Sequence, residues 1–345
     1  MHRRDALKLL QSSLVLWSAS SVVPALAKAK RDTRPVALLL PLTGERAALG
    51  LSMQRAAMLV QSDAALMPVF DTGGTATGAA AAAEAAMKRG VAMVLGPVTA
   101  WETSAAAKVV SSRVPVVAFT NNAAAAANDA FVFGLTPAQT TSAVLRYARS
   151  RGVRRVVVIG DGSAWGAAAT ASATRAQGDL GLDVRAITVQ AGTPLPTAGD
   201  APDAVLLPGS GEAVLAAARN LKGSGIQLLG TVQALDNRPS ALDALDGAWL
   251  AAPDPQAFGG FSTEYEARNG GAPGALAALA YDAARIVGTL RDRNALDRAG
   301  LLGTESFPSV TGAVRFRTDG SCARDLAILV AGSDGYRSVA TSRGA

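Results

Sequence analysis

VALLLPLTGERAALG, residues 36–50, is an apolar run that ends at a Pro/Gly turn and passes into a helical pattern. Residues 36–40 carry no polar side chain on either face, as a central strand of a parallel sheet requires when helices cover both sides. Apolar residues then recur at helical spacing, at Leu49, Met53, Ala56 and Val60. A strand that enters a helix through a short polar turn places Thr43 at the carboxyl edge of the sheet, where open α/β folds bind ligands. This stretch therefore predicts an α/β protein that binds a ligand.

Length and composition predict a globular protein of roughly two domains. The chain has 345 residues, of which 49% are hydrophobic and only 5% are aromatic. So few large side chains argue against a bulky apolar ligand. The formal net charge is +6, but the Lys and Arg residues are scattered and form no basic stripe. We therefore expect no nucleic-acid partner.

Histidine and cysteine are nearly absent, with His2 and Cys322 as the only examples. Since we expect His2 to be removed with an export signal, the mature chain lacks Ser-His-Asp and Cys-His arrangements, His/Cys zinc sites and intramolecular disulfides. Gly73-Gly74 and Gly209-Ser210-Gly211 match neither a Walker A nor a dinucleotide pattern, and we interpret them as turns. We therefore expect no enzyme activity, no metal and no cofactor. An enzyme that relies on carboxylates, Lys, Tyr or a Ser-Lys pair is the third hypothesis.

The first 27 residues have the composition of a signal peptide. Arg3-Arg4 and Lys8 precede an apolar stretch, and Ala25-Leu26-Ala27 is the expected cleavage motif, which leaves Lys28 first. Arg3-Arg4 with Leu7-Lys8 is similar to the twin-arginine type, although Ala6 stands where Phe is usual. The alternative is an uncleaved membrane anchor, for which this Ser-broken run is short. We expect an exported, periplasmic protein that does not span the membrane after cleavage.

The rest of the chain alternates short β-rich runs with Ala-rich helical patterns, which favours parallel sheets. The expected strands are 36–40, 67–70, 91–95, 114–119, 155–160, 184–189, 204–207, 226–229 and 248–251. The expected helices are 46–62, 75–89, 100–112, 137–151, 164–180, 211–221, 258–268 and 273–294.

This alternation is interrupted twice, at residues 131–137 and 251–255, where we expect the chain to cross between two lobes. Thr136 and Pro137 are typical of the cap and first position of a helix. The predicted division is a signal peptide at 1–27, one lobe at 35–135 plus 252–312, and a second at 136–251 plus 313–340. Near the end, 314–320 and 326–330 are predicted to form a hairpin around an Asp-Gly turn.

Short motifs in a consistent order resemble the type I periplasmic binding proteins of the leucine/isoleucine/valine-binding group. They are LLPLTG at 39–44 with Gly50, FDTGG at 70–74, VAMVLGP at 91–97, VPVV at 114–117, FVF at 131–133, VIGDGSAWG at 158–166 and AYDAA at 280–284. The resemblance implies an α/β fold of two Rossmann-like lobes with parallel sheets, joined by a multi-strand hinge. It also implies a protein that captures a small polar ligand, an amino acid or a related carboxylate, for a membrane ABC transporter permease.

A second resemblance concerns the end of the chain. TGAVRF at 311–316, Asp319-Gly320 and RDLAIL at 324–329 are similar to proteins known as penicillin-binding-protein activators, which have the same fold. It implies an alternative function, in which the chain contacts a peptidoglycan synthase. Many of those proteins are lipoproteins, and no Cys lies near the expected cleavage site here.

The first resemblance implies ligand-binding residues at strand ends of the first lobe. Two segments are equivalent to the relatives' carboxylate clamp, GPVTAWE at 96–102 and FTNNA at 119–123. Their candidates, with Thr43, are Thr99, Ala100, Thr120, Asn121 and Asn122. Ala100 stands where the relatives tend to have Ser, so the clamp is incomplete. Thr99 with Glu102 also fits a plain capping box, and Asn121-Asn122 also fits a strand-ending turn.

From the second lobe, the resemblance implies that Asp161 accepts a hydrogen bond from a ligand ammonium and that Trp165 stacks over the ligand. Asp161-Gly162 equally fits the turn into the next helix. Gln233 is a further candidate, in a segment that ends at Asp236. Tyr281-Asp282 is interpreted as structural, holding a hinge helix in place.

Overall fold

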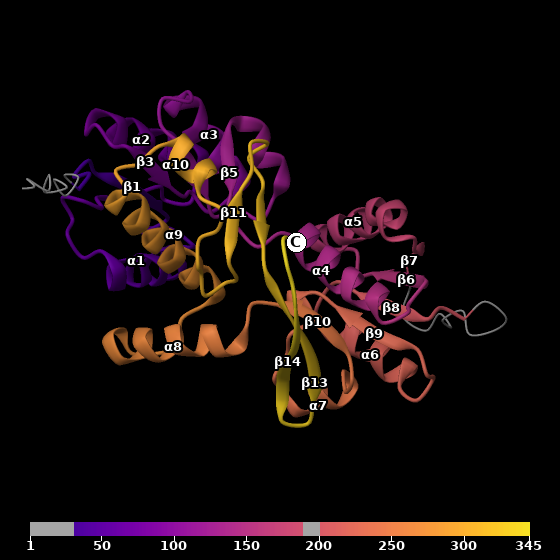
Figure 1. Ribbon diagram of the computed structural model, residues 1–345. Helices are drawn as coiled ribbons and strands as arrows, with labels where there is room; N and C mark the ends of the chain where they lie inside the picture. Colours follow the sequence, from indigo (N-terminus) through magenta and orange to yellow (C-terminus); the bar gives the residue numbers. More distant parts are fainter. Residues whose placement is uncertain (1–30, 189–200) are drawn as a thin grey trace, which may run out of the picture. The chain divides into compact units, whose positions relative to one another are not determined.

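The protein is described here by a computed structural model that covers residues 31–188 and 201–345 (Figure 1). The predicted signal peptide therefore lies outside the described residues. Within the described part, no helix combines the length and the apolar character needed to cross a membrane.

The first sheet consists of five parallel strands, in the order β2-β1-β3-β4-β5. They are β1 (Val36–Leu40), β2 (Val69–Asp71), β3 (Met93–Leu95), β4 (Val116–Ala118) and β5 (Ala130–Val132). Alternate residues of β1 point to opposite faces, and all five are fully buried. Val36, Leu38 and Leu40 pack with α1 (Ala47–Val60) and α9 (Ala275–Asp292). Ala37 and Leu39 pack with α2 (Ala76–Lys88) and α3 (Ala100–Val110), which explains why the run is apolar throughout.

The second sheet is mixed and has seven strands, in the order β14-β13-β10-β9-β8-β6-β7. They are β6 (Arg155–Gly160), β7 (Asp183–Thr188), β8 (Ala204–Leu207), β9 (Gln227–Gly230), β10 (Trp249–Ala252), β13 (Leu326–Gly332) and β14 (Gly335–Ser342). The first five are parallel, whereas β13 runs antiparallel to both β10 and β14.

Helices cover both faces of this sheet for the same reason as in the first. Val156 and Val158 of β6 pack with α4 (Pro137–Ser150) and α5 (Ala164–Leu180). Val157 and Ile159 pack with α6 (Glu212–Leu221) and α7 (Pro239–Ala244). The predicted fold class, α/β with two Rossmann-like halves, is confirmed, while the residues at which the chain divides into lobes stay a prediction.

Caps fix where the connecting helices begin. Thr136 accepts a hydrogen bond from the backbone N–H of Gln139, whose side chain accepts from the Thr136 N–H, and Pro137 is the first helical residue of α4. Pro253 directly follows β10, Asp254 caps α8 (Pro255–Asn269), and Pro255 is the first residue of this helix. Four short helices were not predicted: α7, α10 (Arg298–Gly303) and the 3₁₀ turns η1 (Ala123–Asn128) and η2 (Val232–Ala234).

The predicted carboxyl-terminal hairpin has the right turn but the wrong partner. The Asp319-Gly320 turn joins β11 (Val314–Phe316) to β12 (Cys322–Arg324). Residues 326–330 instead lie in β13, which forms its own hairpin with β14. Both segments are apolar and close in sequence, so local pattern alone did not distinguish the two pairings.

A buried polar network connects the segment before β11 with the crossing after β5. The Asp282 carboxylate of α9 accepts hydrogen bonds from the Val310 N–H (2.8 Å), the Thr311 N–H (3.0 Å) and the Thr311 hydroxyl (2.6 Å). The Arg324 guanidinium donates to the Thr311 hydroxyl and, at 2.6 Å, to the Phe133 carbonyl. Burial raises the pKa of Asp282 more than these hydrogen bonds lower it. Asp282 and Arg324 are fully buried, consistent with the structural role predicted for Asp282.

Candidate functional site

The β1–α1 turn is organised by Asp71, at the end of β2. Its carboxylate accepts hydrogen bonds from the N–H groups of Leu42 (2.8 Å), Thr43 (3.3 Å) and Gly73 (2.8 Å) and from the Thr43 hydroxyl (2.6 Å). Burial raises the pKa of Asp71, but these four donors outweigh it and leave the pKa below its ordinary value. Thr43 is exposed, but its hydroxyl hydrogen is already committed to Asp71. Asp71 was not among the predicted site residues, although it directly follows the strand predicted at 67–70.

The β3–α3 turn contains the capping box that the sequence allowed. Thr99 accepts from the Glu102 N–H, and the Glu102 carboxylate accepts from the Thr99 N–H at 3.1 Å. Glu102 is fully buried and also accepts from the Thr72 hydroxyl at 2.6 Å, which ties this turn to the end of β2. Ala100 begins α3, and the Arg46 guanidinium lies 5.4 Å from the ring centre of Trp101. The capping role of Thr99 is thus present, whereas its ligand contact stays a prediction.

Two residues after β4, Thr120 orients Asn122. Thr120 is buried, and its hydroxyl oxygen accepts from the Asn122 N–H at 3.1 Å. The Asn122 side-chain oxygen in turn accepts from the Ala124 N–H at 3.0 Å and caps η1. Because that oxygen is used in the cap, the amide NH₂ of Asn122 is the group that remains to donate. Both asparagines are exposed.

On the second sheet, Asp161 forms the turn between β6 and α5. Its carboxylate accepts from the N–H (3.0 Å) and hydroxyl (2.7 Å) of Ser163, which caps α5. A Cβ placed on Gly209 would meet this carboxylate at 1.7 Å, and one placed on Gly166 would meet it at 2.1 Å. The two glycines therefore allow Asp161 to lie against the ends of β8 and α5. These contacts belong to the turn interpretation, and a contact between Asp161 and a ligand stays a prediction.

Trp165 is held by a chain of hydrogen bonds along the same edge. Its indole N–H donates to the Thr231 hydroxyl at 3.1 Å, and that hydroxyl donates to the Pro208 carbonyl at 2.5 Å. These residues follow β6, β9 and β8, so the orientation of the indole is set by three neighbouring strands. Gln233 lies nearby in sequence, but only its N–H contacts Thr231, and its side chain is exposed.

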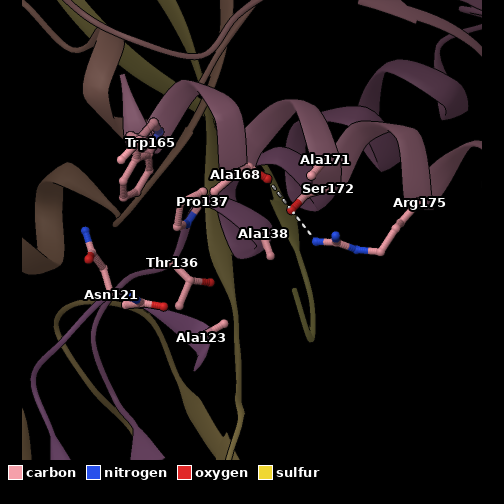
Figure 2. A pocket seen from close by; sticks show the side chains of 12 residues that line it. Asn121, Ala123, Thr136, Pro137, Ala138, Trp165, Ala168, Ala171, Ser172 and Arg175 are labelled. Carbon is pink, nitrogen blue, oxygen red and sulfur yellow. Dashed lines mark hydrogen bonds between the residues drawn. The ribbon is translucent and has the colours of Figure 1, made fainter. Parts of the chain in front are cut away.

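Three of the candidate residues line one pocket, which we call the α5 pocket (Figure 2). Its volume is about 440 Å³. Its lining comes from the end of the first sheet, the start of α4 and one face of α5: Asn121, Asn122, Ala123, Thr136, Pro137, Ala138, Ala164, Trp165, Ala168, Ala171, Ser172 and Arg175. The pocket is elongated along α5, with Trp165 at one end and Arg175, which donates to the Ser172 hydroxyl at 3.0 Å, at the other (Figure 2).

The structure therefore brings together Asn121, Asn122 and Trp165 and leaves the other candidates outside this pocket. Those outside it are Thr43, Thr99, Ala100, Thr120, Asp161 and Gln233. Sequence analysis missed the contributions of Ser172 and Arg175 to the lining. A signal existed for these, because Ala164, Ala168, Ala171 and Arg175 recur at helical spacing on one face of a predicted helix.

The α5 pocket offers hydrogen-bond donors and no negative charge. Of the described residues that line it, none is Asp or Glu, and Arg175 carries a positive charge. The first turns of α4 and α5 both reach the pocket, at Ala138 and at Ala164 with Trp165. N–H groups in a first helical turn have no acceptor within the helix and carry a partial positive charge. This arrangement is suited to an anion, with the Trp165 indole as an apolar surface beside it.

Comparison with known proteins identifies the family. Residues 33–336 match the family described as periplasmic binding protein. The chain belongs to this family. Its members bind solutes and are not enzymes, which confirms the family resemblance drawn from the sequence motifs and the expectation that the protein is not an enzyme. No curated protein matches the sequence.

Solved structures of periplasmic binding proteins share this fold. A protein from Rhodospirillum rubrum described as a branched-chain amino acid ABC transporter is 23% identical, with a TM-score of 0.78 over 89% of this chain and 100% of that one. A solute-binding protein of an ABC transporter from Rhodopseudomonas palustris, solved with 3,4-dihydroxybenzoic acid, is 19% identical, with a TM-score of 0.62 over 91% and 98%. A branched-chain amino acid binding protein from Streptococcus pneumoniae, solved with isoleucine, is 18% identical, with a TM-score of 0.59 over 90% and 99%. At these identities the likeness establishes the fold.

Proposed function

We propose that this protein is the solute-binding component of an ABC-type importer and that it works in the periplasm. Membership of the periplasmic binding protein family supports the general role. In the proposed mechanism, two lobes close over a small carboxylate and present it to a membrane permease. The ligand shifts the equilibrium toward the closed form because it contacts residues of both lobes.

The observation that carries the ligand class is the donor-rich, acid-free lining at the Trp165 end of the α5 pocket. A carboxylate there receives hydrogen bonds from the amide groups of Asn121 and Asn122 and from first-turn N–H groups of α4 and α5. An α-amino acid brings an ammonium group as well, which needs a carboxylate to offset its desolvation. Because the described lining residues supply none, we favour a carboxylate without an ammonium group over an amino acid. Proteins of this fold have been solved with ligands of both classes, isoleucine and 3,4-dihydroxybenzoic acid.

Calorimetric titration of the purified protein with benzoate and with leucine tests this proposal. We expect heat and a rise in melting temperature with benzoate-like carboxylates and a weaker response, or none, with leucine. Binding of leucine tighter than that of every ammonium-free carboxylate would refute the ligand class. No stabilisation by any carboxylate or amino acid would refute the solute-binding role.

A matched pair of variants assigns the binding to the α5 pocket. Asn122→Asp keeps an oxygen that accepts from the Ala124 N–H, so the η1 cap is preserved, but it places a negative charge on the pocket wall. We expect at least about a tenfold loss of carboxylate affinity, since one lost hydrogen bond to a charged group is worth about 1.5–3 kcal/mol. Asn220→Asp adds the same charge at an exposed position of α6, outside the pocket, and serves as the control that retains the affinity.

Export is a separate part of the proposal. The expected signal peptide ends at Ala27, so the amino terminus of the periplasmic protein should be Lys28. Replacing Arg3-Arg4 with Lys-Lys should retain the protein in the cytoplasm if the route is the twin-arginine type. Export that persists in this variant would indicate the general secretory route instead.

The alternative partner, a peptidoglycan synthase, rests on the resemblance at residues 311–329. Many of these residues are buried, among them Val314, Phe316 and Arg324. They therefore contribute to packing around the buried network of Asp282 and Arg324 and offer little surface to another protein. A pull-down that recovers a synthase and no permease would nevertheless favour this alternative.

A further inference from the structure

Arg146, on the third turn of α4, has unpaired hydrogen-bond donors. Its Nε and Nη2 atoms are buried, and neither has a hydrogen-bond partner within the part of the chain that the structure describes. A buried donor without an acceptor costs about 1–3 kcal/mol, and more when the group is charged. Folding therefore leaves this guanidinium in an environment that an added acceptor would stabilise.

Arg146 lines a second pocket, which we call the arginine pocket. Its volume is about 380 Å³. Arg317, from the β11–β12 turn, lines it as well, together with the side chains of Gln139, Ser142 and Ser321. None of the described residues that line it is Asp or Glu. The pocket therefore brings two cations together among neutral donors, with no side-chain anion in its wall.

No ion pair within the described residues neutralises these cations. Burial lowers the pKa of Arg146, and the nearby positive charge of Arg317 lowers it further. Within the described residues, the Arg317 side chain makes one hydrogen bond, at 3.4 Å from Nη2 to the Gly344 carbonyl. Asp319, two residues from Arg317, accepts from the N–H and hydroxyl of Ser321 and lies outside the lining. These hydrogen bonds and the charge of Arg317 lower the pKa of Asp319, so this carboxylate offsets part of the Arg317 charge from outside the pocket. Cys322 also lines the pocket, and burial raises the pKa of its thiol to about 12, so it remains uncharged.

We propose that the arginine pocket is a second anion-binding site, separate from the α5 pocket, and that it takes a small doubly charged anion. Two guanidinium groups in one cavity repel each other, and a dianion offsets both charges where a monovalent ion offsets one. Inorganic phosphate and sulfate present this pair of charges. Bidentate hydrogen bonds from a planar guanidinium suit the oxygen atoms of either anion.

The position of the site connects it with the proposed solute-binding site. Ala123, Thr136 and Ala138 line both pockets, so the first turn of α4 separates them. The Gln139 side-chain amide also donates to the Cys322 carbonyl at 2.6 Å, which fixes this turn to β12. An anion bound to Arg146 and Arg317 therefore braces α4 against the β11–β12 hairpin.

Titration of the full chain with phosphate and with sulfate, each against chloride at matched ionic strength, tests the proposal, because neither is a carboxylate of the class proposed for the α5 pocket. We expect at least one of the two dianions to raise the melting temperature beyond chloride and to bind in calorimetry. Arg146→Gln and Arg317→Gln should each weaken that binding at least about tenfold, the equivalent of one charge-assisted hydrogen bond. No response of the wild-type chain to either dianion would refute the proposal.

Three further variants separate this site from others. Arg337→Gln removes one positive charge on exposed β14, and Arg175→Gln removes the cation of the α5 pocket; both should retain the dianion response. Trp165→Ala should also retain it, so failure of the solute-binding proposal is distinguishable from failure of this one. If Arg146→Gln and Arg337→Gln lose the response equally, the effect is due to net charge and the site is refuted.

The stability of the unligated variants distinguishes a binding role from a structural one. Removing an unpaired buried charge is often neutral or stabilising. Without a dianion, Arg146→Gln should therefore melt no lower than the wild-type chain, and Arg146→Lys, which keeps the charge but loses the planar fork, should bind the dianion more weakly. A large drop in the melting temperature of both variants, with dianion affinity unchanged, would instead assign Arg146 to folding.

Discussion

Replacing Asp282 with Ala tests whether the buried network of Asp282 and Arg324 stabilises the protein. Asp282→Ala removes the acceptor of the Val310 N–H and of the Thr311 N–H and hydroxyl, all in a buried site. Two backbone N–H groups left without partners cost about 1–3 kcal/mol each, and the nearby Arg324 loses the closest negative charge. We therefore expect a loss of about 3–5 kcal/mol in the free energy of unfolding, the range seen when a buried charged partner is removed.

Asp282→Asn is the informative comparison. The amide keeps one oxygen as an acceptor and removes the cost of burying a charge, a cost reflected in the raised pKa of Asp282. We expect a smaller loss, about 1–3 kcal/mol. Urea unfolding followed by circular dichroism measures both, with exposed Asp246→Ala as a control that changes stability by less than about 0.5 kcal/mol. If Asp282→Ala and Asp246→Ala unfold at the same urea concentration, the network does not contribute as described.

Other substitutions test the strand-end turns. A Cβ on Gly50 would lie 2.0 Å from the Pro41 carbonyl oxygen. Gly50→Ala should therefore lower the free energy of unfolding, measured by thermal melting, by about 2 kcal/mol or more. The control Gly178→Ala has open space around it and should stabilise α5. The pKa of Asp71 is lower in the folded chain than the unfolded value of about 3.9, so Asp71 stabilises the fold above that pH, and this contribution is lost as the pH falls through the folded pKa. Asp71→Asn should therefore reduce the loss of unfolding free energy between neutral and acid pH. An unchanged pH dependence would contradict this. Thr231→Val leaves the Trp165 indole N–H without its acceptor and should lower stability by about 1–3 kcal/mol in urea; an unchanged midpoint would show that this bond does not hold the indole.

The sequence predicted those elements whose pattern is set by local periodicity. The strands at 36–40, 155–160 and 204–207 and the helix at 164–180 have the predicted bounds. In each element, burial of one or both faces imposes a periodic pattern of apolar residues, and this pattern can be recognised without knowing which elements pack against it. The hairpin at 314–330 was mispredicted because strand pairing depends on distant segments: β13 pairs with both β10 and β14.

The candidate site was predictable in part, for a related reason. Asn122 and Trp165 were found through the family resemblance, whose motifs lie after strands, where open α/β folds bind ligands. Arg175 was missed because it is the twelfth residue of α5 and enters the pocket only through the packing of that helix. Arg146 and Arg317 are 171 positions apart, and only the fold brings them to one cavity.

The guanidinium of Arg324 limits which motions the predicted hinge allows. It binds the carbonyl of Phe133, in the first crossing, and the hydroxyl of Thr311, before β11, at the same time. A rotation that separated these two chain segments would have to break charge-assisted hydrogen bonds at a buried side chain. Spectroscopic probes attached beside Phe133 and Thr311 should therefore report the same separation with and without ligand, and the axis of the proposed closure should pass close to this side chain.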